Sequence, residues 1–105
     1  MYRVELSKRA LRDLRGIDHK GRKRLLDQLE DDLAAEPQRA NLDIKQLTGR
    51  APWLRLRRGE YRVLYRPLTP TELQAVGAQE QAGFLVERVV DRRDLERAAS
   101  TLPGT

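Results

Sequence analysis

The segment that most constrains the fold is 53-WLRLRRGEYRVLYR-66, in which apolar and charged residues alternate on both sides of a glycine. Alternation with a period of two is typical of a β-strand that has one buried face and one exposed face. The segment therefore predicts a β-hairpin with strands over about 53–58 and 61–66. It also contains five arginines and a single glutamate. Facing like charges destabilise a strand pair, and a segment that breaks a local rule in this way is typical of a functional site.

We place the two-residue turn of this hairpin at Arg58-Gly59, which sets Arg55 opposite Arg62. The side chains then separate onto two faces. The face predicted to meet the core holds Leu54, Leu56, Tyr61, Val63 and Tyr65. The other face holds Trp53, Arg55, Arg57, Glu60, Arg62 and Leu64. Several guanidiniums on one exposed face suit the binding of phosphate. The alternative is a solvated outer face on which one arginine pairs with Glu60.

Two helices are predicted before the hairpin. Residues 2–6 alternate as a short strand, and Ser7 is a good N-cap for a first helix that begins at Lys8. Leucines at spacings of three and four predict a second helix over 19–35 or 21–35, because Pro37 ends it.

Two segments, 37–52 and 68–83, have no clear period and are predicted to be loops, the second with a helical turn near 72–76. Residues 84–91 are rich in β-branched side chains and predict a strand, and residues 92–100 predict a short terminal helix. The order β-α-α-β-β-β-α predicts an α+β fold. In it, two N-terminal helices pack on one face of a small, twisted, mostly antiparallel sheet, and the other face is open.

Length and composition narrow the classes of function. The 105 residues suggest one domain over 1–100, followed by a flexible tail over 101–105. With no cysteine and one histidine, neither a metal site nor a cofactor is expected, and the short apolar runs predict no association with a membrane. A reducing cytoplasm is the compartment that fits best.

The charge of the chain has two readings. Of its 21 basic residues, 17 are arginine, and the net charge is +5. Such a ratio arises from a GC-rich genome, or from a polyanionic partner such as a nucleic acid.

Four segments together resemble the RelE/ParE superfamily of toxins from type II toxin–antitoxin modules, and its RelE branch in particular. They are 2-YRVELSKRALRDL-14, 45-KQLTG-49, 54-LRLRRGEYRVLYR-66 and 89-VVDRRDLER-97. The third, which contains R-x-R-x-G-x-Y-R in a hairpin, is the most specific. The resemblance implies the fold predicted above. It also implies a metal-independent endoribonuclease that cuts mRNA on the ribosome and is held inactive by an antitoxin.

The resemblance also implies which residues act on RNA. Basic side chains on the sheet would orient the scissile phosphate and stabilise the charge that develops on it. The positions that match the catalytic ones are Arg55, Arg57, Arg62, Arg92 and Glu96. The candidates for RNA binding are Lys45, Trp53 and Arg93. Trp53 would stack on a base, or would instead anchor the preceding loop by burial.

Glu96 marks a departure from the family. Many relatives have a tyrosine or histidine near the start of the terminal helix, whereas this sequence has no tyrosine after Tyr65. Glu96 is the candidate general base, and the alternative is a surface carboxylate paired with Arg92 or Arg93. Two other functions stay open. One is a ParE-like toxin that poisons DNA gyrase without nuclease activity. The other is a catalytically weakened toxin that only binds its antitoxin or a nucleic acid. The antitoxin is expected to be a small acidic protein.

Overall fold

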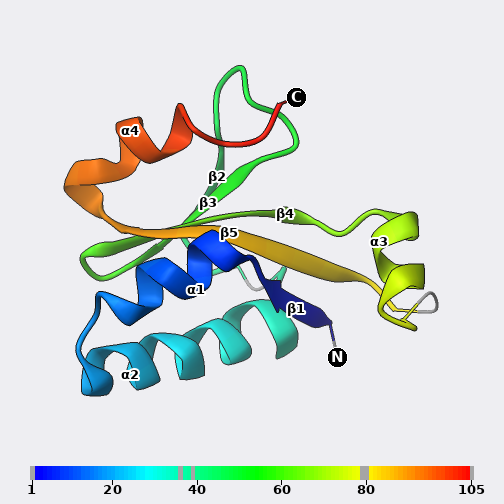
Figure 1. The fold of residues 1–105 in the computed structure, drawn as a ribbon, viewed down its shortest axis with the longest axis horizontal. Helices are drawn as coiled ribbons and strands as arrows, with labels where there is room; N and C mark the ends of the chain where they lie inside the picture. The colour runs from blue at the N-terminus through cyan, green and yellow to red at the C-terminus, as the bar shows by residue number, and fades with distance from the viewer. Residues whose placement is uncertain (1, 36, 39, 79–80, 105) are drawn as a thin grey trace.

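The computed structural model describes residues 2–35, 37–38, 40–78 and 81–104 (Figure 1). Its strands are β1 Arg3–Leu6, β2 Ile44–Gln46, β3 Leu54–Arg58, β4 Tyr61–Pro67 and β5 Gly83–Asp91. Its helices are α1 Lys8–Arg15, α2 His19–Leu29, a π-helix η1 Glu30–Ala35, α3 Pro70–Ala75, a 3-10 turn η2 Arg92–Asp94 and α4 Leu95–Ala99. None of the helices in the described part of the chain is long and apolar enough to cross a membrane.

The strands form a five-stranded sheet in the order β1-β5-β4-β3-β2. Only β1 and β5 pair in parallel, and the other three neighbouring pairs are antiparallel. Figure 1 shows α1 and α2 on one side of this sheet and α4 on the other. The predicted α+β fold, with two N-terminal helices on one face of a mostly antiparallel sheet, is therefore confirmed.

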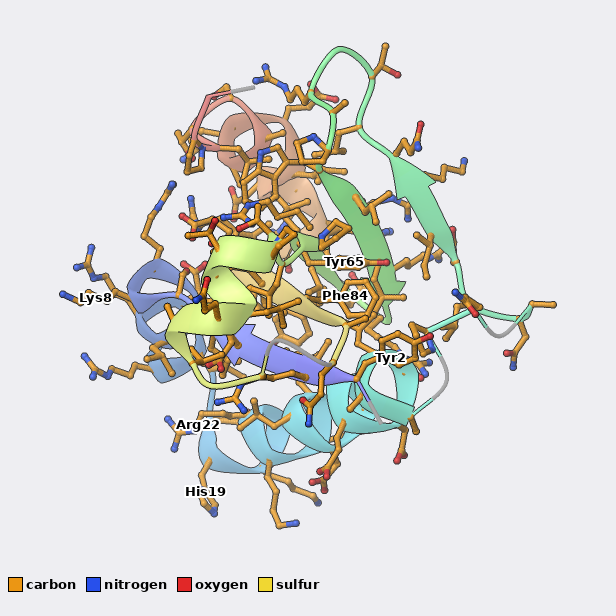
Figure 2. All side chains as sticks on the ribbon, turned by 90° about the vertical axis from the view of Figure 1, so that its right-hand side faces the viewer. Tyr2, Lys8, His19, Arg22, Tyr65 and Phe84 are labelled. Atoms are coloured by element: carbon orange, nitrogen blue, oxygen red, sulfur yellow. The ribbon has the colours of Figure 1, made fainter. Side chains whose placement is uncertain are left out.

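The main core lies between the sheet and the two N-terminal helices. Its buried residues are Ala10, Leu14, Leu25, Leu29, Leu33, Leu56, Val63, Tyr65, Val86 and Val89. At the end of the core near β1, Phe84 lies between two tyrosines, with ring centroids 5.6 Å from Tyr65 and 5.8 Å from Tyr2 (Figure 2). The hairpin contributes the side chains that its alternation assigned to the core.

The first two helices begin where the sequence predicts. The Ser7 hydroxyl accepts a hydrogen bond from the Ala10 amide at 3.1 Å, and the Asp18 carboxylate accepts one from the Gly21 amide at 3.1 Å. The second helix runs to Ala35 as predicted, but its last six residues form the π-helix η1. Within η1 the carboxylate of Asp32 is fully buried and accepts two hydrogen bonds from the Arg58 guanidinium.

The predicted loop over 37–52 contains a strand that was not predicted, and the helical turn predicted near 72–76 is part of the longer helix α3. Within 37–52, β2 pairs with β3 and sets Ile44 opposite Leu56. Within 68–83, α3 begins with a capping box in which Thr69 and Glu72 each accept a hydrogen bond from the other's amide. Residues 79 and 80 of this segment lie outside the described residues.

The second face of the sheet is not open, which corrects the prediction. The terminal helix predicted over 92–100 forms as η2 followed by α4, and α4 packs across this face. A smaller apolar cluster lies beneath it, comprising Leu64, Val90 and Ala98, with Leu47, Leu95 and Leu102 packed against them.

Candidate nucleic-acid interface

The hairpin turn lies one residue later than predicted, so the pairing register between the two strands differs from the predicted one by two residues. The turn is Gly59-Glu60, and Gly59 takes a φ of 55°, which favours glycine. Arg57 therefore lies opposite Arg62, whereas Arg55 faces Leu64. The side chains still separate onto the predicted faces, since a register shift of two residues keeps the same alternation. Two like charges face each other across the strands, as expected, but Arg57 replaces Arg55 in the pair.

Arg55 is not an exposed guanidinium, which corrects a second expectation. It is only 9% exposed, and its Nη2 donates to Oδ1 of Asp43 at 3.1 Å. The other oxygen of the same carboxylate lies 3.9 Å from Nη1 of Arg57. The Arg57 amide also donates to the Asp43 carbonyl at 3.0 Å. Asp43 thus neutralises part of the charge of two of the three predicted arginines.

Arg62 lies at the centre of the positive charge. Its Nη1 donates to the carbonyl oxygens of Gly59 and Tyr61, both at 3.0 Å. Burial lowers the pKa of Arg62, and the nearby guanidiniums of Arg57, Arg55 and Arg92 lower it further, whereas Glu60 raises it. Arg62 makes no ion pair with any described residue. An anion added beside Arg62 would relieve this repulsion.

Arg92 joins the group from the end of β5. Its amide donates to the Glu60 carbonyl at 2.8 Å, and its Nε lies 3.0 Å from the Glu60 carboxylate. These contacts hold η2 against the hairpin turn. The alternative in which Glu60 pairs with an arginine of the hairpin is wrong, because its partner is Arg92 from the end of β5. Because 57% of the Arg92 side chain is exposed, it still reaches solvent.

The remaining polar candidates lie around this group. Lys45 is exposed on β2 and lies directly across from Arg55. Arg93 is 83% exposed and donates to Asp91, whose carboxylate also accepts from the Arg93 amide. That amide, followed by the Arg93 side chain, lowers the pKa of Asp91. Glu96 is exposed on α4 and makes no ion pair within the described part of the chain, so its expected pairing with Arg92 or Arg93 is wrong.

Trp53 follows the second of its two predicted roles. It is 2% exposed, and its Nε1 donates to the Pro103 carbonyl at 3.3 Å. The Arg66 guanidinium carbon lies 5.5 Å from the Trp53 ring centroid, and Arg66 is held in place by two hydrogen bonds to Glu72. The indole therefore anchors the segment between β2 and β3, and its ring is not available to stack on a base in this structure.

Together these residues define what we call the arginine face: Lys45, Arg55, Arg57, Arg62 and Arg92. They come from four strands or strand ends and approach one another near the hairpin turn. Asp43, which links two of the arginines, was not among the predicted site residues. One signal was available, since Leu42, Ile44 and Gln46 alternate with charged residues as an edge strand does. Among the described residues no group of three or more histidine, aspartate or glutamate side chains could hold a metal ion.

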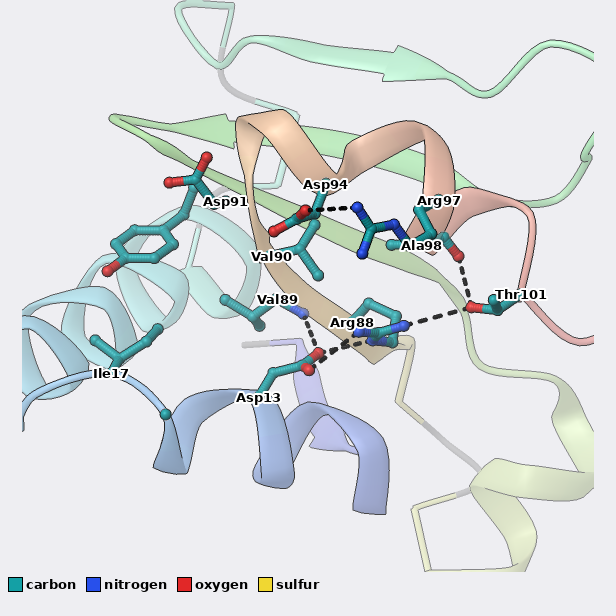
Figure 3. Close-up of a pocket in the computed structure, with 12 residues that line it drawn as sticks. Asp13, Ile17, Arg88, Val89, Val90, Asp91, Asp94, Arg97, Ala98 and Thr101 are labelled. Atoms are coloured by element: carbon teal, nitrogen blue, oxygen red, sulfur yellow. Dashed lines mark hydrogen bonds and ion pairs between the residues drawn. The ribbon is translucent and has the colours of Figure 1, made fainter.

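A separate cavity of about 370 Å³ lies between α1, β5 and α4 (Figure 3). At its wall Arg88 donates to both oxygens of Asp13 at 2.8 and 3.2 Å, and Arg97 lies 3.6 Å from Asp94. These charges are neutralised in pairs. The cavity therefore has none of the unbalanced positive charge that marks the arginine face.

Comparison with solved structures places the fold among the RelE toxins. The chain is similar to the RelBE2 toxin–antitoxin complex from Mycobacterium tuberculosis, with 27% identity and a TM-score of 0.64 over 87% of this chain and 98% of that one. It is also similar to the RelE–RelB complex from Pyrococcus horikoshii, with 26% identity and a TM-score of 0.59 over 87% of this chain and 94% of that one. The isolated RelE toxin of Escherichia coli shares 18% identity and a TM-score of 0.57 over 97% of this chain and 100% of that one, which is a likeness of fold alone. A search of curated proteins gave no match.

The fold defines the chain as a RelE-like protein, and the sequence then defines the family. The model of the ParE toxin of type II toxin–antitoxin systems, parDE, matches residues 4–83. The chain therefore belongs to the ParE toxin family, which confirms the resemblance to the RelE/ParE superfamily. The match ends at the first residue of β5, so Arg92, Arg93 and Glu96 lie beyond it.

Proposed function

We propose that this toxin is a metal-independent endoribonuclease that cleaves mRNA on the ribosome and so blocks translation. The observation that carries the proposal is the direct opposition of Arg57 and Arg62 on the sheet, next to Arg92. Like charges opposite each other cost stability, and a scissile phosphate would supply the missing negative charge. The family alone does not choose this activity, because one fold supports several functions.

The chemistry requires positive charge more than any other group. When the 2′-hydroxyl attacks the neighbouring phosphorus, negative charge builds on the phosphoryl oxygens and the bond to the 5′-oxygen breaks. Arg57 and Arg62 would stabilise that charge from a fixed geometry, and Lys45, Arg55 and Arg92 would add to the field. The 2′-hydroxyl must also lose a proton and the 5′-oxygen must gain one. Glu96 is the candidate base, and its exposed position on α4 lets it approach RNA.

The proposed partners follow from the same assignment. Two of the similar structures are complexes of a RelE toxin with a RelB antitoxin. We therefore propose that a cognate antitoxin, small and acidic, holds this toxin inactive, and that the toxin acts in the cytoplasm, where ribosomes are found. The proposal treats residues 1–100 as one toxin domain.

The decisive test compares Arg62→Ala and Arg57→Ala with Arg3→Ala, an arginine paired with Glu5 on β1 far from the hairpin turn. We expect each of the first two changes to lower cleavage of ribosome-bound mRNA by at least about 100-fold and to abolish growth inhibition. We expect the control to cleave as the wild type does. Circular dichroism must show all three variants folded. Full cleavage by the double variant Arg57→Ala/Arg62→Ala would refute the arginine face as the catalytic site.

Poisoning of DNA gyrase is the second candidate function, and the match to the ParE family favours it. The two functions give different products after induction. Discrete cuts in mRNA, found by primer extension, support the nuclease. An SOS response with intact mRNA supports the gyrase poison. If neither occurs while the antitoxin still binds, the chain is a weakened toxin, which the absence of a tyrosine after Tyr65 favours.

A further inference from the structure

The net positive charge of this protein is carried by two neighbouring elements, the helices α1 and α2. Residues 8–29, which form α1, α2 and the turn between them, hold eight basic and three acidic residues. The rest of the chain holds thirteen of each. The whole net charge of +5 therefore belongs to the two-helix layer, and the remainder, including the arginine face with its carboxylates, is neutral.

The three acidic residues of this layer already have partners. Asp13 accepts hydrogen bonds from the Arg88 guanidinium and from the Val89 amide at 2.9 Å, so its charge is directed to the sheet. Asp18 caps α2. Asp27 accepts from Lys23 at 3.3 Å. None of the three is available to the other cations of the layer.

Five exposed cations of the layer make no ion pair or hydrogen bond with any described residue: Lys8, Arg12, Arg15, Lys20 and Arg24. Along α1 the first three follow one another at spacings of four and three, so they lie on one side of the helix. The buried residues Ala10 and Leu14 occupy the opposite side. Lys20 and Arg24 are one turn apart on the exposed side of α2.

We call these five residues the helical basic face. Figure 2 shows Lys8 directed into solvent, away from the aromatic residues Tyr65 and Phe84. The helices that carry this face pack on the sheet surface opposite to the one crossed by α4, so the main core separates the helical basic face from the arginine face (Figure 1).

We propose that the helical basic face is a second RNA-binding surface, which contacts the phosphate backbone without reading sequence. Three of these cations share one side of α1 and two share one side of α2, so like charges repel within each helix. Binding to a polyanion would relieve that repulsion and release counterions. Lysine is depleted at protein interfaces, although arginine is enriched there, whereas nucleic-acid interfaces are rich in positive charge of both kinds. The face has no aromatic residue, and the two exposed leucines of these helices, Leu11 and Leu26, are too few for an apolar protein interface.

Such a surface would act independently of the cleavage chemistry. Non-specific phosphate contacts steer a protein to RNA at high rate and fix its orientation, but they carry no sequence information. An RNA bound to the helical basic face would be separated by the main core from the mRNA cleaved at the arginine face. The inference therefore does not depend on the proposed nuclease activity, and it holds equally for a toxin that binds RNA without cleaving it.

The test measures binding of a labelled single-stranded RNA oligonucleotide as a function of salt, with the full chain in an Arg62→Ala background. Arg12→Gln/Arg15→Gln removes two members of the helical basic face, and glutamine keeps a helix propensity close to that of arginine. The matched control is Arg3→Gln/Arg97→Gln, which lowers the net charge equally at two arginines that have acidic partners. Thermal unfolding checks that both variants stay folded.

We expect the first variant to bind RNA several-fold more weakly and to reduce the slope of log K against log salt by about 1.4, two single-strand phosphate contacts. The control should keep the wild-type slope. Equal loss of slope in both variants would show that only net charge matters and would overturn the proposal. An unchanged RNA slope would overturn it too, and loss of antitoxin affinity alone would assign the face to a protein partner instead.

Discussion

At the scale of single residues, the carboxylate of Asp43 determines how much positive charge the arginine face presents. It lies 3.1 Å from Arg55 and 3.9 Å from Arg57. The buried Arg55 needs such a partner, because an unpaired buried charge is costly. A carboxylate in this position also occupies the nitrogens that would bind a phosphate, so Asp43 holds Arg55 in place and at the same time competes with RNA.

We therefore expect Asp43→Asn to affect stability and RNA binding in opposite directions. Loss of the charged partner should lower the free energy of unfolding by about 1 kcal/mol, because the Asp43 side chain is 45% exposed and water screens the pair. RNA affinity should rise, with a steeper dependence on salt. Urea unfolding and RNA titration measure the two effects. Glu5→Gln, which breaks the Arg3 pair on β1, is the control and should leave RNA affinity unchanged.

The same residues show what could be read from the sequence. Alternation alone assigned the hairpin side chains to the correct faces, because the faces depend only on the period of two. The pairing across the strands depends on the turn, and here glycine takes the first turn position with a positive φ, whereas the prediction put it second. The burial of Arg55 had no local signal, since it depends on β2 and Asp43, which are brought alongside by the fold.

At the scale of elements, α3 is held to the sheet by one ion pair. Arg66 on β4 donates to both oxygens of Glu72 at 2.7 and 2.9 Å. The same carboxylate accepts from the Thr69 amide and closes the capping box. The hydrogen bonds from Arg66, helped by that amide, lower the pKa of Glu72 to about 2. From the sequence this helix was predicted only as a single turn, because it is six residues long and begins at Pro70, which resembles a loop residue after Pro67.

Because the pKa of Glu72 is lowered in the folded protein, the stability of α3 depends on pH in the acidic range. Because the carboxylate is more acidic when folded, its contribution is complete above its ordinary pKa of 4.5 and is lost as the pH falls through about 2. We expect Glu72→Gln to remove that part of the pH dependence. Since 35% of the Glu72 side chain is exposed, the effect should be below about 1 kcal/mol. Urea unfolding of both proteins between these pH values measures it, and parallel curves would contradict the assignment.

At the scale of the whole molecule, the residues after α4 contact α1, near the N-terminus, and Trp53, just before β3. Arg9 on α1 donates to the Thr101 carbonyl at 2.9 Å and to its hydroxyl at 2.5 Å. The Pro103 carbonyl accepts from Trp53, and Leu102 packs on the cluster beneath α4. From the sequence alone, residues 101–105 were expected to be a flexible tail, since their short polar composition gives no local signal of contacts made with distant residues.

A chain that ends at Ser100 distinguishes a bound tail from a flexible one, because Trp53 is the only tryptophan. If the tail is bound, its removal exposes the indole, and we expect a red shift of tryptophan emission and a loss of about 2 kcal/mol in unfolding free energy. A chain that ends at Pro103 is the matched control, since it keeps every one of these contacts. If emission and stability are the same in all three proteins, the tail is flexible and α4 alone covers the second face of the sheet. If only the shorter chain changes, the C-terminus is part of the structure that orients the segment between β2 and β3, and with it Lys45.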